Sequence, residues 1–279
     1  MYTVPLPRIG TDEAWRDAAK RLVGAGVSPA DVLWNFDAET EELFAPATPL
    51  PPLTRRIKAP QSFVSLANTV AWHKDPQRFA RLYALLWRLR HETGLMQDRA
   101  DPELSKLRQM EKGVHRCKHK MKAFVRFRDL RQGGARRSFA AWFEPIHHSV
   151  EPAAPFFARR FADMDWMIAT PDVTAQFVDG HLSFHPGQPK PDLPKDAAEA
   201  LWGTYFCNIF NPARLKVSAM TSEMPKKYWK NLPEAQHMHD LIAGAEDKGR
   251  KMQEAAPTLS PERVDKIKRQ LRSDAPTTD

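Results

Sequence analysis

The spacing of apolar residues changes twice along the chain, and this change constrains the fold more than any other feature. On either side of residues 122–186 the apolar side chains recur every three or four positions, which is the period of a helix. Inside that block they alternate, and Asp179-Gly180 is a strong signal for a two-residue hairpin turn. A helix that starts at Ser149 divides the block. The pattern predicts an α+β fold in which a central antiparallel β-β-α-β-β unit is embedded in a mostly helical chain.

The same periodicities place the individual elements. Strands are expected at 32–36, 124–128, 139–143, 166–169, 174–178 and 181–184. Helices are expected at 12–23, 61–73, 76–91, 101–121, 149–163, 195–209, 212–220, 225–230 and 233–245. We expect one domain over residues 1–245, helical in 1–121 and 195–245 with the strands in 122–186. A charged tail, 246–279, follows, and one helix over 261–272 is predicted within it.

Several classes of protein are disfavoured by what the sequence lacks. No apolar run approaches the roughly 18 residues of a membrane span, and the N-terminus does not resemble a secretory signal. The only two cysteines, Cys117 and Cys207, exclude a disulfide scaffold. Nucleotide-binding loops and the nucleophile elbow of α/β-hydrolases are missing. We therefore expect a cytoplasmic globular protein without a membrane segment, a bound metal or a cofactor.

The basic residues are concentrated in one part of the chain. The formal net charge is +8, but residues 105–137 alone contain twelve Lys or Arg and two acidic residues, so the rest of the chain sums to −2. Such a concentration indicates an anionic partner, most simply nucleic acid. The alternative is an ordinary solvated basic helix face.

Two basic stretches are candidates for nucleic-acid binding. The first consists of Arg116, Lys118, Lys120, Lys122, Arg126 and Arg128. The second consists of Arg214, Lys216, Lys226, Lys227, Trp229 and Lys230. The first stretch would follow a phosphate backbone, whereas aromatic rings beside lysines suit stacking on an unpaired base. For Trp229, insertion into the core is an equally good interpretation.

Two adjacent histidines give a candidate for acid–base chemistry. His147 and His148 lie between the strand at 139–143 and the helix at 149–163, with Glu144 and Glu151 close by in sequence. A histidine paired with a carboxylate can act as a general base. A structural or capping role is the alternative, because adjacent histidines point apart on a strand or a helix.

A set of motifs occurs in the same order as in one bacterial family. The motifs are Ala71-Trp-His-Lys-Asp-Pro76 with Arg78-Phe79, His119-Lys-Met-Lys-Ala-Phe-Val-Arg-Phe-Arg128, Trp142-Phe-Glu-Pro145, Ala154-Pro-Phe-Phe157 with Arg159-Arg-Phe161, Ile209-Phe-Asn-Pro-Ala-Arg-Leu-Lys216, and Glu223-Met-Pro-Lys-Lys-Tyr-Trp-Lys-Asn-Leu-Pro-Glu234. Through them, roughly residues 1–245 resemble a bacterial DNA-metabolism or DNA-repair protein family that carries a domain of unknown function.

The resemblance implies partners as well as a context. In that family the domain occurs alone, associated with a radical-SAM protein of DNA modification or repair. It also occurs fused in front of a uracil-DNA glycosylase-like, uracil-DNA-binding domain. This chain lacks the water-activating and base-binding motifs of such a glycosylase, and His185-Pro186-Gly187 is only a partial match.

Three hypotheses about function follow. The first is an accessory protein that binds DNA through a basic surface and works with a glycosylase-like or radical-SAM partner. The second is an enzyme acting on damaged or uracil-containing DNA, in which His147 or His148 pairs with Glu144 or Glu151 and the substrate meets Asn211 or Arg214. The third is a protein-docking module without DNA affinity of its own.

Overall fold

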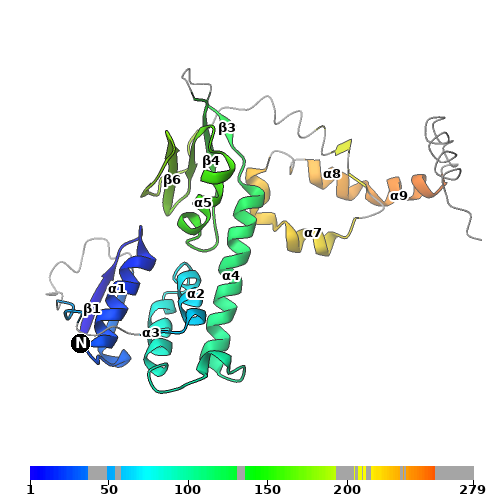
Figure 1. The fold of residues 1–279 in the computed structure, drawn as a ribbon. Coiled ribbons are helices and arrows are strands. Elements are labelled where there is room, and N and C mark those ends of the chain that lie inside the picture. The colour runs from blue at the N-terminus through cyan, green and yellow to red at the C-terminus, as the bar shows by residue number, and fades with distance from the viewer. Residues whose placement is uncertain are drawn as a thin grey trace, which may run out of the picture.

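The computed structural model describes residues 1–36, 49–53, 58–130, 136–192, 204, 207–208, 210–211, 215–232, 235 and 237–254. Helices make up most of its regular structure, together with a five-stranded and a two-stranded sheet (Figure 1). The predicted α+β class is confirmed. In the described part of the chain, no helix is both long enough and apolar enough to cross a membrane.

The small sheet is formed by the first residues of the chain. Strand β1 (Tyr2–Leu6) pairs in parallel with β2 (Val32–Phe36), and α1 (Thr11–Gly24) makes the crossover between them. The sequence analysis predicted α1 and β2 but missed β1. The proline within β1 hides its strand character, although Val4 and Leu6 are both buried.

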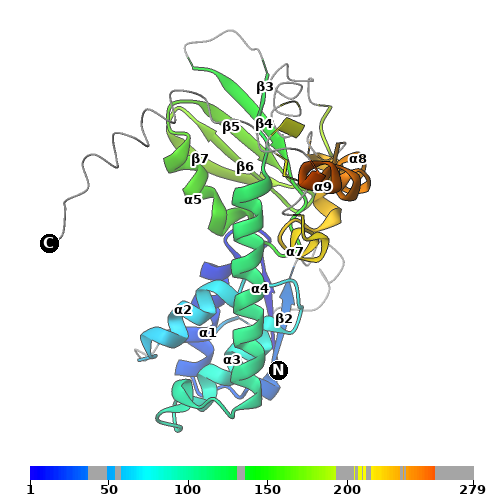
Figure 2. The same ribbon diagram turned by 90° about the vertical axis from the view of Figure 1, so that its right-hand side faces the viewer.

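A long helix connects the two apolar cores of the protein. Helices α2 (Gln61–Val70) and α3 (Arg78–Arg88) pack against α4 (Pro102–Phe124), and α1 packs against α3 in the same core. The second half of α4 enters the core beneath the large sheet through Met121. Figure 2 shows α4 running through both parts of the molecule. The predicted helix start is confirmed, because Asp101 accepts a hydrogen bond from the Leu104 amide at 2.7 Å.

The large sheet contains the predicted β-β-α-β-β unit. Its strands lie in the order β3 (Arg128–Asp129), β4 (Ser138–Trp142), β5 (Asp165–Ala169), β6 (Val173–Val178) and β7 (His181–Pro186). Helix α5 (Val150–Arg160) connects β4 to β5 and returns the chain to the same edge, so these two strands are parallel. The sheet is therefore mixed, whereas the sequence analysis expected antiparallel pairing throughout.

The turn predicted near the end of the β-β-α-β-β unit agrees with the structure, whereas the strand predicted at its start does not. The hairpin at Asp179-Gly180 is confirmed, and both residues have positive φ angles, of 49° and 82°. The strand predicted at 124–128 is wrong except for its last residue. Met121 is fully buried and continues the apolar stripe of α4, so the helix extends to Phe124.

The last described elements are short. They are α7 (Val217–Glu223), the 3-10 helix η4 (Lys226–Asn231), α8 (Met238–Ala243) and α9 (Ala245–Glu254). They correspond to the helices predicted at 212–220, 225–230 and 233–245 and to the start of the tail. The helix predicted at 195–209 falls almost entirely outside the described residues, and the one at 261–272 falls wholly outside them.

Candidate functional site

The exposed side of α4 is basic. At about 100° per residue, positions 112, 116 and 119 share one face, and the structure leaves Lys112, Arg116 and His119 exposed there. Lys122 is also exposed at one border of this face, and Lys120 lies at the other. The second half of α4 therefore presents cations across its whole solvent-facing arc.

The two borders of this arc are fixed by different neighbours. On one side the Lys122 ammonium lies 4.6 Å from the centre of the Phe156 ring of α5. On the other side the Lys120 ammonium donates to the carbonyl of Glu223 and, at 2.9 Å, to its carboxylate. Lys118 is partly buried, and burial together with the nearby Lys122 charge lowers the pKa of its ammonium.

Helix η4 adds a second group of cations beside α4. The Tyr228 ring is buried between two other rings. Its centre lies 5.4 Å from the centre of the Phe124 ring and 5.3 Å from that of the Phe143 ring. This aromatic contact holds the segment against the end of α4. It leaves Lys226, Lys227 and Lys230 exposed beside the end of α4, with Lys227 and Lys230 near Glu144. Figures 1 and 2 both place α7, which precedes η4, alongside the upper half of α4.

We define the basic face as the exposed cations of these two elements. It consists of Lys112, Arg116 and Lys122 of α4 and Lys226, Lys227 and Lys230 of η4. The two basic stretches selected from the sequence are far apart in the chain, and the Tyr228–Phe124 and Lys120–Glu223 contacts place the second stretch beside the end of α4. Lys112 was not selected, although its place four positions before Arg116 on the same helix would have found it.

The remaining predicted binding residues have different positions. Arg126 donates from Nη1 to the Ala123 carbonyl at 2.7 Å and so lies across the end of α4. Arg128 is half-buried in β3, opposite Ala140 of β4. Lys216 is exposed just before α7, and Arg214 lies outside the described residues. Trp229 is half-buried, and its indole N–H donates to the Met224 carbonyl at 2.9 Å.

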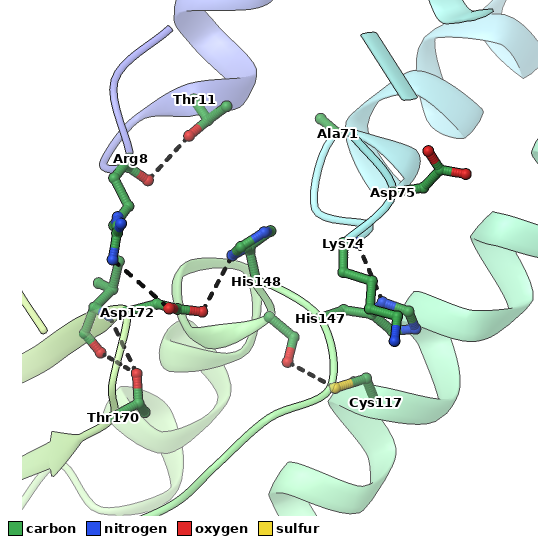
Figure 3. A network of polar contacts seen from close by, with 12 residues as sticks. Arg8, Thr11, Ala71, Lys74, Asp75, Cys117, His147, His148, Thr170 and Asp172 are labelled. Atoms are coloured by element: carbon green, nitrogen blue, oxygen red, sulfur yellow. Dashed lines mark hydrogen bonds and ion pairs between the residues drawn. The ribbon is translucent and has the colours of Figure 1, made fainter. Parts of the chain in front are cut away.

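A second candidate site lies at the carboxyl ends of the parallel strands β4 and β5. His147 and His148 follow β4, and Thr170, Pro171 and Asp172 follow β5. Loops at this edge of parallel strands are the usual place for ligand sites in α/β units, because they converge there. We call this region the histidine junction. The two histidine side chains point in opposite directions within it (Figure 3).

His147 points toward α4 and is buried. Its Nδ1 accepts a hydrogen bond from the Lys74 amide at 3.3 Å, and its ring lies 4.3 Å from that of His73. Burial, followed by the charges of His73 and Lys74, lowers the pKa of His147 to about 4. The imidazole is therefore neutral at physiological pH. The neighbouring Ser149 does not cap α5 with its side chain, although the sequence predicts this. Its Oγ lies 3.2 Å from Cys117 Sγ instead.

His148 points to the other side, toward Asp172. The distance from its Nδ1 to Asp172 Oδ2 is 3.3 Å, which is within the range of an ion pair. The neighbouring His148 side chain is the main reason that the pKa of Asp172 lies below its ordinary value. Arg8 Nη1 lies 3.6 Å from the other carboxylate oxygen of Asp172. The N-terminal segment thus contacts the junction, as Figure 3 shows.

Glu151 completes this side of the junction. Its Oε2 accepts from the Gly10 amide at 3.0 Å, while its Oε1 is buried without a hydrogen-bond partner among the described residues. Burial raises the pKa of Glu151 to about 7. Glu151, His148 and Asp172 line one cavity of about 10 Å³, which is just large enough for a single water molecule.

Glu144, predicted as a partner for a histidine, is engaged by side chains of η4. The Glu144 carboxylate lies 2.8 Å from the Lys230 ammonium and accepts from the Asn231 side chain at 3.2 Å. The sequence analysis missed Asp172, Arg8 and His73. Of these, Asp172 carried a usable signal, since a polar residue just after a buried strand is typical of a site.

Two further predictions about the site concern a substrate contact and a metal. Asn211 is exposed, and Arg214 falls outside the described residues, so their proposed role at a substrate stays a prediction. In the described ranges, no group of three or more His, Cys, Asp or Glu side chains is arranged to hold a metal ion.

Comparison with known proteins gives one match. A family model for DUF4130, a domain of unknown function, matches residues 76–234, which is more than half of the chain. Neither a curated protein nor a solved structure matches. The matched stretch contains the whole basic face together with His147, His148, Glu151 and Asp172, whereas Arg8 and His73 precede it.

Proposed function

The chain belongs to the DUF4130 family, and from the arrangement of its residues we propose that it is a DNA-binding accessory protein of DNA repair or DNA metabolism. The observation that carries the proposal is the basic face. Two stretches about 100 residues apart in the sequence contribute exposed cations around the second half of α4, and the aromatic contact of Tyr228 with Phe124 fixes their relative position. The repair context comes from the family resemblance of the motifs.

The charge distribution supports an anionic polymer as the partner. Residues 105–137 carry a net charge of +10 while the rest of the chain is slightly acidic, so the positive potential is concentrated around α4. Lys and Arg side chains neutralise phosphates and release counterions, which makes binding strong at low salt and weak at high salt. On this proposal, a glycosylase-like or radical-SAM protein would act on the DNA that this chain holds.

A charge-matched pair of variants tests the proposal. In the first, Lys112, Arg116 and Lys226 are replaced by Glu; in the control, the exposed Lys20, Lys58 and Lys251 are replaced by Glu. Both change the net charge equally. Fluorescence anisotropy with labelled DNA should show a loss of at least about 100-fold in affinity for the first variant and less than about fivefold for the control. Equal losses would mean that the basic face is not the binding site.

A second candidate function is favoured by the His148–Asp172 contact. A carboxylate beside one ring nitrogen orients a histidine whose other nitrogen can then accept a proton from a substrate or a water molecule. We propose this as the alternative: an enzyme acting on damaged or uracil-containing DNA. Its test is product formation by the wild type and loss of that product in the D172N variant. An accessory protein would form no product at all.

The same measurements distinguish a third function, a docking module for an acidic protein, from the two functions above. Such a module would not bind DNA at low salt. It would retain a salt-sensitive protein partner after nuclease treatment, and the basic-face variant would release that partner.

A further inference from the structure

We infer that the basic face binds the sugar–phosphate backbone of double-stranded DNA and does not hold unpaired bases. This inference rests on the proposed DNA-binding function and specifies the form of DNA. It is carried by two independent features: where the aromatic rings lie, and the shape of the surface that carries the cations.

The aromatic rings of the described residues are buried or only partly exposed. None of the Phe, Tyr or Trp side chains in the described ranges is exposed. Proteins that bind single strands without sequence preference stack successive bases on exposed rings, and each stacked base contributes substantially to binding. The described residues therefore offer no fully exposed ring as a stacking platform.

The rings closest to the basic face are occupied by other contacts. Tyr228 is only 2% exposed and lies between Phe124 and Phe143. Trp229 is half-buried, and its N–H is held by the Met224 carbonyl. The rings of Phe156 and Tyr228 each lie against a lysine, Lys122 and Lys227. These rings position cations for phosphates and are not available to bases.

The shape of the surface favours a stiff partner. The α4 cations of the basic face run from Lys112 to Lys122, about 15 Å along the helix axis, which corresponds to about four to five base pairs of B-form DNA. The helix is anchored in both apolar cores, so its cations are held at fixed spacing before DNA arrives. A duplex also holds its phosphates at fixed spacing, whereas a single strand must lose conformational freedom to match a rigid row of cations.

The test compares one labelled 20-nucleotide strand, alone and annealed to its complement, in anisotropy titrations across a salt series. We expect the duplex to bind at least about tenfold more tightly than the single strand at about 150 mM salt. The R116E variant should bind the duplex more weakly than the wild type does. A single strand that binds as tightly as the duplex, or more tightly, overturns the inference but leaves the proposed DNA binding intact. No binding to either form overturns both.

A second variant reports directly on base stacking. Trp229→Leu keeps a smaller apolar side chain and removes the aromatic ring. If the protein holds the backbone, this variant should change affinity for both forms by less than about twofold. A selective loss of tenfold or more for the single strand would show that Trp229 stacks on bases and would contradict the inference.

Discussion

Gly113 of α4 faces the imidazole of His147, and a Cβ atom at position 113 would lie 3.1 Å from His147 Nε2. Glycine normally destabilises a helix interior by about 0.5–1 kcal/mol relative to alanine. Its presence in the middle of α4 is explained by the space that the two stacked histidines, His73 and His147, occupy. The histidine junction is therefore built against α4, on the flank of that helix that carries Gly113.

A larger side chain at position 113 should displace His147. We expect Gly113→Leu to lower the free energy of unfolding by about 2 kcal/mol, because overpacking outweighs the gain in helix propensity. Gly249 of α9 is the matched control, since a Cβ there meets no atom within 4 Å. Gly249→Leu should leave stability unchanged or raise it. Urea denaturation measures both, and equal effects would show that position 113 is not constrained by the imidazole.

The hydroxyl of Tyr228 is buried and has no hydrogen-bond partner among the described residues. Burial raises the pKa of this phenol above its ordinary value. Removing an unsatisfied buried hydroxyl relieves a desolvation cost, so Tyr228→Phe should stabilise the protein by up to about 1 kcal/mol. Thermal unfolding measures the change, and a clear loss of stability would mean that the hydroxyl does have a partner.

Removing the whole ring of Tyr228 should have the opposite effect. Tyr228→Ala should cost about 3 kcal/mol and free η4 from α4, because the ring is packed between Phe124 and Phe143. Limited proteolysis should then cut near residues 224–231 while α4 stays protected. DNA affinity should fall at the same time, since Lys226 and Lys230 lose their place beside α4.

Glu151 should make the folded state less stable as pH rises. Its pKa is about 7 in the folded protein and 4.5 when unperturbed, so the folded state binds more protons between these values. The contribution of Glu151 to stability is fully present below about pH 4.5 and is lost as pH rises through about 7. Glu151→Gln should remove this loss. Denaturation of both proteins at pH 5 and pH 8 measures the difference, which should be larger at pH 8.

His147 should act in the opposite direction over an overlapping range. Its pKa is lowered from 6.5 to about 4, so the unfolded state binds more protons and stability falls as pH drops from 6.5 toward 4. In His147→Asn the amide oxygen can accept the Lys74 N–H without titrating. We expect this variant to lose stability less steeply than the wild type in that range. An unchanged slope would show that His147 does not titrate as described.

Some parts of this structure follow from local sequence, and their physical reasons are clear. Asp101-Pro102 begins α4 because the carboxylate caps the Leu104 amide, and Asp179-Gly180 makes the hairpin because both residues tolerate positive φ. The helix periodicity also predicts which positions of α4 face solvent. Each of these signals depends only on residues a few positions apart.

Other parts depend on contacts that local patterns do not contain. Alternation predicts that β4 and β5 are strands, but their parallel pairing is decided by the path of α5. The Glu144 carboxylate binds Lys230, and Lys120 binds Glu223, about 90 and 100 residues away in the sequence. Periodicity cannot anticipate such pairs. For the same reason the partner of His148 was sought at a nearby glutamate, whereas the structure places Asp172 beside it.

Helix α4 belongs to both apolar cores, with Leu104 and Leu107 in the first and Met121 in the second. An unbroken helix transmits order along its length, because each turn is hydrogen-bonded to the next. Loosening of either core therefore removes support from the other. Seen in a calorimeter, the described part of the chain should melt in a single cooperative event, although it contains two separate sheets.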